Sequence, residues 1–267
     1  MANRVQVLGI LNITEDSFSD GGRYIETSAA IEHGRRLLEQ GADLLDLGAA
    51  SSHPDAVAVA PREEIERLRP VLSAFPGANL SVDSFRPEVQ RFALEAGVRT
   101  LNDIHGFPHP ELYGEFASAG VRLIVMHAVQ SAGIATRVPV PATEIVARVL
   151  AFFDRRVEAL LKAGIRREQI VIDPGMGFFL GSEAEASKNV LRALPELKAR
   201  YGLPICVSVS RKSFLGAITG KETAQRGAAT LSAELFAVQN GADYVRTHDV
   251  GALRDGLAVW ISLSGRP

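Results

Sequence analysis

The sequence predicts an α/β fold in which eight strand-and-helix units close into one barrel. The first observation behind this prediction is a repeated junction, where an amphipathic stretch ends at a glycine and a short apolar run follows. Glycine is favoured just after a helix because that position often requires a positive φ. Successive junctions lie between 20 and 44 residues apart, the length of one strand plus one helix. The junction glycines are Gly41, Gly77, Gly97, Gly120, Gly164, Gly202 and Gly241.

The second observation is that most of the apolar runs are continuous rather than alternating, as expected for parallel strands buried on both faces. Seven junctions, with one strand before the first, give eight strands. The chain lacks the glycine fingerprint of a dinucleotide-binding, open doubly wound sheet, so a closed barrel is favoured. We therefore predict a single-domain (β/α)8 TIM barrel over residues 1–267. The expected strands are Val5–Leu11, Asp43–Leu47, Leu80–Val82, Thr100–Leu101, Arg122–Met126, Gln169–Ile172, Ile205–Val209 and Tyr244–Val245.

Helical patterns lie between these runs, and proline indicates where two of them begin. Proline suits the first position of a helix, where its missing N–H costs nothing, and Pro61 and Pro87 both stand at such positions. After Pro61, Leu68 and Leu72 share one apolar face. Pro70 is expected to kink that helix because it removes a hydrogen bond of the helix interior.

Composition excludes several classes of function. Hydrophobic residues make up 46% and charged residues 22% of the chain, which is ordinary for a globular protein. The net charge of −2 and the lack of a strongly basic segment argue against nucleic-acid binding. No apolar stretch approaches the ~20 residues that span a membrane, and Val5–Leu11 is short for a signal sequence. The lone Cys206 permits no disulfide within the chain, so we expect a cytoplasmic protein.

Polar side chains gather where the predicted strands end. In barrels of this kind the active site forms at the carboxyl ends of the strands. One such residue can simply cap the next helix, but polar residues at seven strand ends together predict a binding site. The long, glycine-tipped loop Asn12–Gly22 is expected to be a mobile lid. The strand-end residues are Asn12, Asp83, Asn102, Asp103, His127, Asp173, Ser210, Lys212, Arg246 and His248.

The residue types at these strand ends indicate the kind of ligand. Asp83, Asn102 and Asp173 suit the edge of a flat heterocycle, because a carboxylate accepts two parallel N–H bonds from an amidine-like edge. Lys212 and Arg246 suit ring oxygens or phosphates, and an arginine plane also stacks on a ring. These residues by themselves predict an enzyme that binds an anionic heterocycle.

The same segments, in this order along the chain, resemble the dihydropteroate synthase family across nearly the whole length. Each segment alone is moderately specific, whereas the ordered set on eight strands is strongly specific. The matching segments are Gly9–Gly22, Ser81–Ser84, Leu101–Asp103, Val125–His127, Ile172–Phe178, Ser210–Ser213 and Arg246–Val250.

The resemblance implies a transferase of folate biosynthesis. Such an enzyme condenses 6-hydroxymethyl-7,8-dihydropterin pyrophosphate with 4-aminobenzoate to give 7,8-dihydropteroate and pyrophosphate. The reaction breaks the C–O bond to pyrophosphate with cationic character on the pterin methylene, which the aromatic amine then attacks. The resemblance also implies Mg²⁺ as cofactor and a homodimer formed through the last helices.

The resemblance assigns a role to individual positions of this chain. Pterin binding falls to Asp83, Asn102, Met126, Asp173, Lys212 and Arg246. Pyrophosphate binding falls to Asn12, His53, Arg246 and His248, with Asn12 also as the metal ligand. Aminobenzoate binding falls to Ser52, Phe178, Phe179, Lys212 and Ser213. The residues expected to be catalytic are Asp173, Lys212 and Arg246.

Two segments depart from the family pattern. The usual Gly-Gly-Glu-Ser-Thr-Arg-Pro-Gly is replaced by residues 48–55, so that His53 stands where a phosphate-binding arginine is expected and Ala50 replaces an acidic residue. After Asp173, Gly177–Gly181 replaces the usual Gly-Phe-Gly-Lys, and the segment is two residues longer. Both departures are similar to the transmissible, sulfonamide-insensitive branch of the family, so we expect sulfonamide insensitivity.

Two alternatives remain at this point. A methyltetrahydrofolate-dependent methyltransferase would share the pterin carboxylates but would not need Ser210–Ser213 beside a pyrophosphate loop. A non-catalytic pterin-binding barrel would explain His53 as a sign of decay, but the presence of Asn12, Arg246 and His248 argues against it. Release of pyrophosphate from the two synthase substrates separates all three possibilities.

Overall fold

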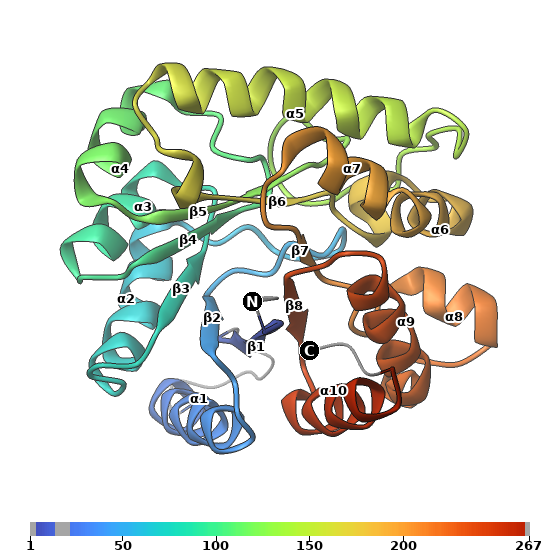
Figure 1. Ribbon diagram of the computed structural model, residues 1–267. Helices are drawn as coiled ribbons and strands as arrows, with labels where there is room; N and C mark the ends of the chain where they lie inside the picture. The colour runs from blue at the N-terminus through green and yellow to red at the C-terminus, as the bar shows by residue number, and fades with distance from the viewer. Residues whose placement is uncertain (1–3, 14–21, 265–267) are drawn as a thin grey trace.

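The strands of the computed structural model, which describes residues 4–13 and 22–264, form one parallel eight-stranded sheet that curves into a barrel (Figure 1). The strand order is β6-β5-β4-β3-β2-β1-β8-β7. A bridge between Ile172 and Ile205 closes the ring, and the Ile172 N–H donates to the Pro204 oxygen at 2.9 Å. The predicted (β/α)8 TIM barrel is therefore confirmed. The strands are β1 Gln6–Asn12, β2 Leu44–Gly48, β3 Leu80–Asp83, β4 Thr100–Asp103, β5 Arg122–Met126, β6 Ile170–Asp173, β7 Cys206–Val207 and β8 Tyr244–Thr247.

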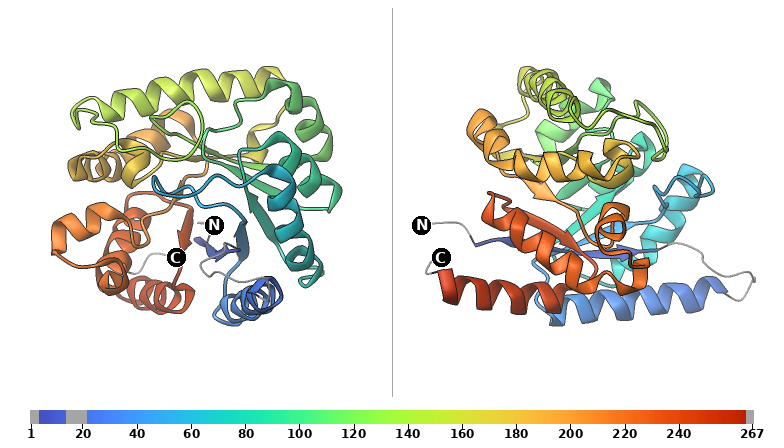
Figure 2. Two further views of the ribbon diagram at one scale, coloured as in Figure 1. Left: turned by 180° about the vertical axis from the view of Figure 1, so that it is seen from behind. Right: turned by 90° about the vertical axis from the view of Figure 1, so that its right-hand side faces the viewer.

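Helices surround this barrel on the outside (Figures 1 and 2). Helix α2 begins at Pro61 and α3 at Pro87, as predicted, and α2 continues past Pro70. No helix in the described parts of the chain is long and apolar enough to cross a membrane. The α-helices are α1 Gly22–Glu39, α2 Pro61–Ser73, α3 Pro87–Glu95, α4 Tyr113–Ala119, α5 Ile145–Lys162, α6 Ala184–Arg192, α7 Leu194–Tyr201, α8 Ser213–Thr219, α9 Gly227–Gln239 and α10 Val250–Ser264.

The predicted junctions agree with the structure, whereas some strand ends differ. All seven junction glycines have a positive φ, between 59° and 102°. Strands β4 and β8 run on into Asp103 and Thr247, because backbone hydrogen bonding rather than side-chain polarity decides where a strand ends. Strand β7 covers only Cys206–Val207, and the chain beyond it turns, with the Lys212 N–H donating to the Val209 oxygen at 3.1 Å.

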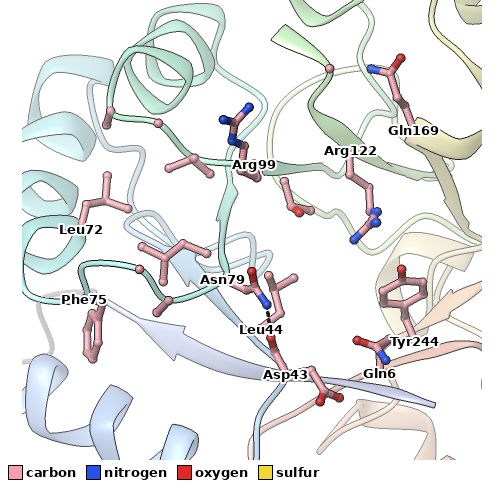
Figure 3. A pocket seen from close by; sticks show the side chains of 18 of the residues that line it. Gln6, Asp43, Leu44, Leu72, Phe75, Asn79, Arg99, Arg122, Gln169 and Tyr244 are labelled. Carbon is pink, nitrogen blue, oxygen red and sulfur yellow. Dashed lines mark hydrogen bonds between the residues drawn. The ribbon is translucent and has the colours of Figure 1, made fainter. Parts of the chain in front are cut away.

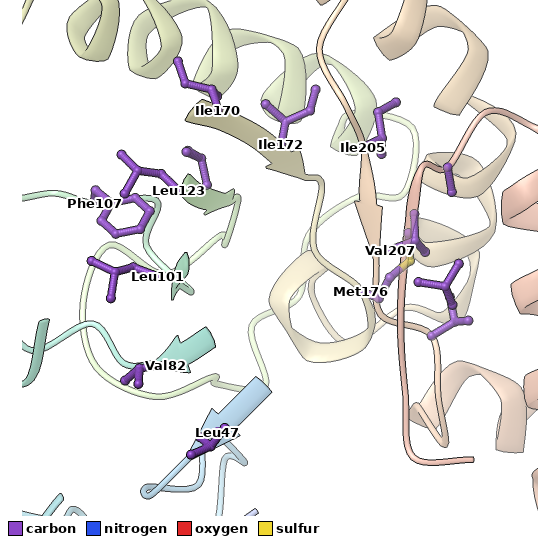
Figure 4. Packing of buried hydrophobic residues seen from close by; sticks show 14 of the residues in the cluster. Leu47, Val82, Leu101, Phe107, Leu123, Ile170, Ile172, Met176, Ile205 and Val207 are labelled. Atoms are coloured by element: carbon purple, nitrogen blue, oxygen red, sulfur yellow. The ribbon is translucent and has the colours of Figure 1, made fainter. Parts of the chain in front are cut away.

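The main hydrophobic core lies between the strands and the surrounding helices. Successive side chains of a strand point to opposite faces of the sheet, so every second apolar residue faces outward toward the helices. Figure 4 shows such side chains from β2 to β7 forming one continuous layer. Leu47, Val82, Leu101, Leu123 and Val207 are all completely buried in this layer.

The interior of the barrel holds a smaller apolar layer that positions the site above it. Leu8, Leu44, Ile124, Val171 and Cys206 form this layer, with Tyr244 packed against it. Because side chains alternate, the residue two places further along each strand also faces inward. Those next inward-facing residues are Ile10, Asp46, Met126, Asp173, Ser208 and Arg246. The polar residues among them therefore lie close together at the carboxyl end of the barrel, next to the apolar layer.

The amino end of the barrel holds a cavity of about 680 Å³ on the other side of the apolar layer (Figure 3). Arg99 and Arg122 line it and are exposed to solvent. The Asn79 amide donates to the Asp43 backbone oxygen at 3.2 Å. Residues of this end belong to short turns that lead from helices into strands.

Candidate active site

A cavity of about 600 Å³ opens at the carboxyl end of the barrel. Ten of the thirteen predicted site residues line it; five of them were expected from the ends of the strands and five from the family resemblance. The other three are buried on the inner faces of β4, β5 and β6: Asn102 is 4%, Met126 7% and Asp173 2% exposed. The ten lining residues are Asn12, Ser52, His53, Asp83, Phe178, Phe179, Lys212, Ser213, Arg246 and His248.

Arg246 forms the centre of a buried ionic cluster. Its Nε donates to Asp46 Oδ2 at 2.5 Å, and its Nη2 donates to Asp83 Oδ2 at 2.8 Å. Asn102 Nδ2 donates to the same Asp46 oxygen at 3.2 Å. Our sequence reasoning missed Asp46, although a single carboxylate inside the apolar run Leu44–Gly48 was a usable signal, because a buried charge needs a partner.

Burial shifts the protonation of this cluster. Removal from water raises the pKa of Asp83 to about 7; Arg246 opposes this shift, whereas the nearby Asp46 adds to it. Burial lowers the pKa of Arg246, but Asp46 and Asp83 outweigh it, so the net shift is upward. The guanidinium therefore stays charged, whereas Asp83 exchanges its proton near neutral pH. Perturbed groups of this kind cluster at functional sites.

Asp173 lies at the end of β6, where the chain turns sharply around one of its oxygens. The Gly175 N–H donates to Asp173 Oδ1 at 2.8 Å. Gly175 has φ 75°, and a Cβ at this position would lie 2.3 Å from the His127 oxygen, so the turn requires glycine. Burial raises the pKa of Asp173 to about 6, against the Gly175 hydrogen bond and the charges of Lys212 and Arg246. Asp173 is consequently ionised at neutral pH.

Lys212 reaches the cavity from a turn with an unusual backbone. Arg211 has φ 59°, a left-handed conformation that non-glycine residues rarely adopt. The Arg211 N–H donates to Thr230 Oγ1 at 3.1 Å, and Arg226 Nη1 donates to the Arg211 oxygen at 2.9 Å. Lys212 is partly buried, with Nζ 5.0 Å from the centre of the Phe179 ring, whereas Arg211 is exposed. Burial and Arg246 lower the pKa of Lys212 to about 8.

His248 lies beside the phosphate side of the predicted site. Its Nδ1 is 2.9 Å from Ser210 Oγ, and its backbone N–H donates to the same hydroxyl at 3.3 Å. Burial, with Arg211 and Arg246 nearby, lowers the pKa of His248 to about 3. The imidazole is therefore neutral at physiological pH and can take part in hydrogen bonds without bringing a positive charge.

Two other strand-end residues turn out to stabilise loops instead of facing the cavity. Asp103 accepts hydrogen bonds from Gln90 Nε2 at 2.9 Å and from the His105 N–H at 2.7 Å. His127 is 3% exposed, contacts the Phe152 ring edge-on and has its Nδ1 3.3 Å from the Pro174 oxygen. Both follow an inward-facing residue, so strand alternation directs them outward.

The mouth of the cavity is formed by the loops after β2, β5 and β6. The backbones of these loops are linked, since the Ala135 N–H donates to the Ser52 oxygen at 3.0 Å and the Val129 N–H to the Phe179 oxygen at 2.9 Å. His53 contacts the Phe178 ring edge-on, with centroids 6.0 Å apart. Most of the predicted lid Asn12–Gly22, residues 14–21, lies outside the described residues.

The two adjacent phenylalanines have different surroundings, which the sequence alone did not reveal. Phe179 is 6% exposed and packs with Met126, Ile104 and Ala135. Phe178 is only partly buried and lies at the mouth beside His53. Phe179 thus belongs to the wall of the cavity, whereas Phe178 lies at its entrance.

The donor set at the carboxyl end is compatible with a weakly held magnesium ion. Among the described residues, no group of three histidine, cysteine or acidic residues is placed to hold a metal ion. Magnesium, however, usually keeps several waters and binds one or two protein oxygens together with substrate phosphates. The exposed Asn12 side chain at the end of β1 offers such an oxygen at the cavity.

Comparison with known proteins identifies the family. The family described as "Pterin binding enzyme" matches residues 8–248. The chain is 51% identical over 256 residues to dihydropteroate synthase type-3 of Escherichia coli, covering 95% of this chain and 97% of the relative. It is 52% identical over 259 residues to the type-2 synthase of Escherichia coli, covering 96% and 95%. The chain belongs to the dihydropteroate synthase family.

Solved structures agree with this assignment. A dihydropteroate synthase of Xanthomonas albilineans, determined with 4-aminobenzoic acid, superposes with a TM-score of 0.87 at 40% sequence identity. The match covers 99% of this chain and 94% of that chain. The family and the fold predicted from the sequence are thus confirmed, and the similarity to synthases disfavours the methyltransferase alternative. The roles of individual residues remain predictions.

Proposed function

We propose that this member of the dihydropteroate synthase family is a transferase that joins 6-hydroxymethyl-7,8-dihydropterin pyrophosphate to 4-aminobenzoate, giving 7,8-dihydropteroate and pyrophosphate. The observation that carries the proposal is the set of buried and partly buried residues at one end of the barrel: Asp83, Asn102, Asp173, Lys212 and Arg246. Asn102 and Asp173 are buried inside the barrel, whereas Asp83, Lys212 and Arg246 line the cavity above them. A substrate with a heterocycle at one end and a pyrophosphate at the other could place its ring against the buried residues and its phosphates in the cavity.

The pterin ring would occupy the interior end of this set. Asn102 Oδ1 and Ser208 Oγ are buried and have no hydrogen-bond partner among the described residues. Buried polar atoms are normally paired, so these two atoms suit donors of a bound heterocycle. Asp173 would accept N–H bonds from the guanidine-like edge of the pterin, and Met126 would line the slot. Arg246 would stack on the ring while Asp46 and Asp83 hold it in place.

The chemical step would be promoted by charge at both ends of the breaking bond. Asp173, ionised at neutral pH, would favour the positive charge that develops on the pterin methylene as the C–O bond breaks. Arg246 and the neutral imidazole of His248 would bind the departing pyrophosphate, with His53 at the mouth. Magnesium, held by Asn12, would supply further positive charge to the leaving group. Lys212 and Ser213, with Ser52, would orient 4-aminobenzoate so that its amine reaches the methylene carbon.

The decisive measurement is release of pyrophosphate by the purified protein. We expect release only when both substrates and Mg²⁺ are present, together with formation of 7,8-dihydropteroate. Lys212→Ala should lose most of the activity, whereas Arg91→Ala, on the outer helix α3, should keep it. Absence of pyrophosphate release from the intact wild-type protein would refute the synthase assignment and favour a non-catalytic pterin-binding barrel.

The departures at the mouth support a second part of the proposal, insensitivity to sulfonamides. Sulfonamides place a bulkier sulfonyl amide where 4-aminobenzoate has a flat carboxylate, and an aromatic ring at the entrance can admit one and obstruct the other. Phe178 lies at the entrance and Phe179 in the wall. Phe178→Gly should therefore gain inhibition by a sulfonamide more than Phe179→Gly, while substrate use is largely kept. Strong inhibition of the wild type at low drug concentration would contradict this part alone.

We also propose that the whole chain forms one cytoplasmic domain that assembles as a homodimer through its last helices. Large apolar side chains are exposed there: Phe236 on α9 is 41% exposed, and Val259 and Leu263 on α10 are 60% and 84% exposed. Contiguous exposed apolar surface often marks an interface. Sedimentation of the wild type should give a dimer mass, and Val259→Asp should shift it toward the monomer. A monomeric wild type would refute the dimer.

A further inference from the structure

Arg137, in the loop after β5, joins the loops after β2 and β6 above the mouth of the cavity. Its Nη1 donates to Asp55 Oδ1 at 2.7 Å, and its Nη2 donates to Asp55 Oδ2 at 2.5 Å. The carbon of the same guanidinium lies 5.4 Å from the centre of the Phe178 ring. One side chain thus contacts Asp55 from the loop after β2 and Phe178 from the loop after β6. We call Asp55 and Arg137 the clasp.

The geometry of the clasp restricts the Phe178 ring. Two parallel hydrogen bonds fix the plane of a guanidinium as well as its position, and a cation is attracted to an aromatic face. The Asp55 N–H donates to Nδ1 of His53 at 3.3 Å, and the His53 ring meets Phe178 edge-on. Phe178 therefore contacts two side chains, those of Arg137 and His53, that both interact with Asp55.

A further contact links the backbones on which these side chains stand. Gln130 Nε2 donates to the Phe178 oxygen at 3.2 Å and to the Thr136 oxygen at 3.1 Å. Thr136 directly precedes Arg137, so the side-chain amide of Gln130 links the backbone next to Arg137 to the backbone of Phe178. The contacts that restrain Phe178 thus come from both its ring and its main chain.

We propose that Arg137 and Asp55 are specificity-determining positioning residues, which hold Phe178 across the entrance so that it admits 4-aminobenzoate and obstructs bulkier sulfonamides. This inference rests on the proposed function. Neither residue belongs to the buried cluster around Arg246, so the clasp acts through Phe178 and not on the reacting atoms. It follows that breaking the clasp should change the ratio of drug inhibition to substrate affinity, with little effect on pterin use.

The test is a double-mutant cycle with Arg137→Ala, Asp55→Asn and the double variant, measured as the inhibition constant of a sulfonamide. The Michaelis constants of both substrates are measured in parallel. Exposed ion pairs contribute modestly, so each single variant should strengthen inhibition by up to about five-fold. The double variant should match Arg137→Ala, because loss of the guanidinium already removes the contact that Asp55→Asn weakens. The pterin Michaelis constant and kcat should stay at their wild-type values.

Matched controls separate the clasp from a general loss of surface charge and from loop unfolding. Arg91 and Glu115 form a two-pronged ion pair of similar exposure on α3 and α4, so Arg91→Ala should leave inhibition unchanged. In a Phe178→Gly background, Arg137→Ala should have no further effect, because the ring on which the clasp acts is gone. Thermal unfolding of each variant shows whether the loops remain folded.

Each outcome has a defined meaning. Unchanged inhibition in the clasp variants, additive effects in the double variant, or an undiminished effect of Arg137→Ala without Phe178 would each overturn the clasp while leaving the synthase assignment intact. The clasp proposal would also be overturned if the active wild type were inhibited by the sulfonamide as strongly as Phe178→Gly. Phe178 would then not discriminate between the drug and 4-aminobenzoate. Failure of the proposed function is recognised separately, by absence of pyrophosphate release without any drug.

Discussion

The barrel has a cavity at each end, and the two are similar in volume, about 600 Å³ at the carboxyl end and about 680 Å³ at the amino end. They differ in how charge is held. At the carboxyl end the fully buried Asp46 is paired with the partly buried Arg246, whereas at the amino end Arg99 and Arg122 are exposed (Figure 3). The volumes of the two cavities therefore do not show which one is the functional site. The removal of charged side chains from water at the carboxyl end does show it, because such groups cluster at functional sites.

The direction of the strands explains this difference. The carboxyl ends of all the parallel strands lie at the same end of the barrel, where longer loops carry His53 and Phe178. At the amino end, short turns with glycines such as Gly77 and Gly97 connect the helices to the strands. The apolar layer of Leu8 and its neighbours separates the two ends, so a substitution at one end should not reach the other through the interior.

The largest expected difference between the ends concerns Asp173. Asp173→Asn removes the buried carboxylate that is proposed to accept hydrogen bonds from the pterin edge, and hydrogen bonds to charged groups contribute ~1.5–3 kcal/mol. Pterin affinity measured by calorimetry should fall by about ten- to 150-fold, with 4-aminobenzoate affinity less affected. Wild-type pterin affinity in this variant would remove Asp173 from the site.

The matched substitution at the amino end should affect stability instead. Asp43 accepts from Arg254 Nη2 at 2.5 Å and from the Val7 N–H at 2.8 Å, which ties β1 and β2 to α10. Asp43→Asn should lower the free energy of unfolding by ~1–2 kcal/mol in a urea titration. Pterin affinity should remain that of the wild type. A large loss of pterin affinity in this variant would mean that the two ends are coupled.

The pH dependence of activity tests whether the ionised carboxylates at the carboxyl end of the barrel control the reaction. Since the pKa of Asp83 is raised to about 7 and that of Asp173 to about 6, both carboxylates gain protons as pH falls, and kcat/KM should decline below about pH 7. Because the charge of Asp46 raises the pKa of Asp83, Asp46→Asn should move this decline to lower pH. A pH profile that Asp46→Asn leaves unmoved would show that Asp83 does not control it.

The smallest expected effect belongs to His53 at the mouth. An arginine carries a permanent positive charge and can donate two parallel hydrogen bonds to a phosphate. His53→Arg should therefore bind pterin pyrophosphate at least as tightly as the wild type in calorimetry, whereas His53→Ala should bind it slightly more weakly. Wild-type affinity in His53→Ala would show that His53 does not bind phosphate. The exposed ring would then serve to contact Phe178 and to accept the hydrogen bond from the Asp55 N–H.

The sequence by itself determined the barrel, and ten of the residues that it predicted for the site line the cavity. Glycine conformation and continuous apolar runs are local properties, and strand alternation is enough to direct Asp173 inward and His127 outward. Ordered motifs then identified the family. These features were readable because each depends on residues that are neighbours along the chain.

Only the tertiary structure decided which side chains meet across the barrel. Asp46 and Arg246 are 200 positions apart, and they pair because β2 and β8 lie on either side of β1 in the sheet. Asp55 and Arg137 are 82 positions apart and meet with Phe178 where three loops converge. No local pattern encodes such contacts, because they depend on the register between strands and on the paths of separate loops.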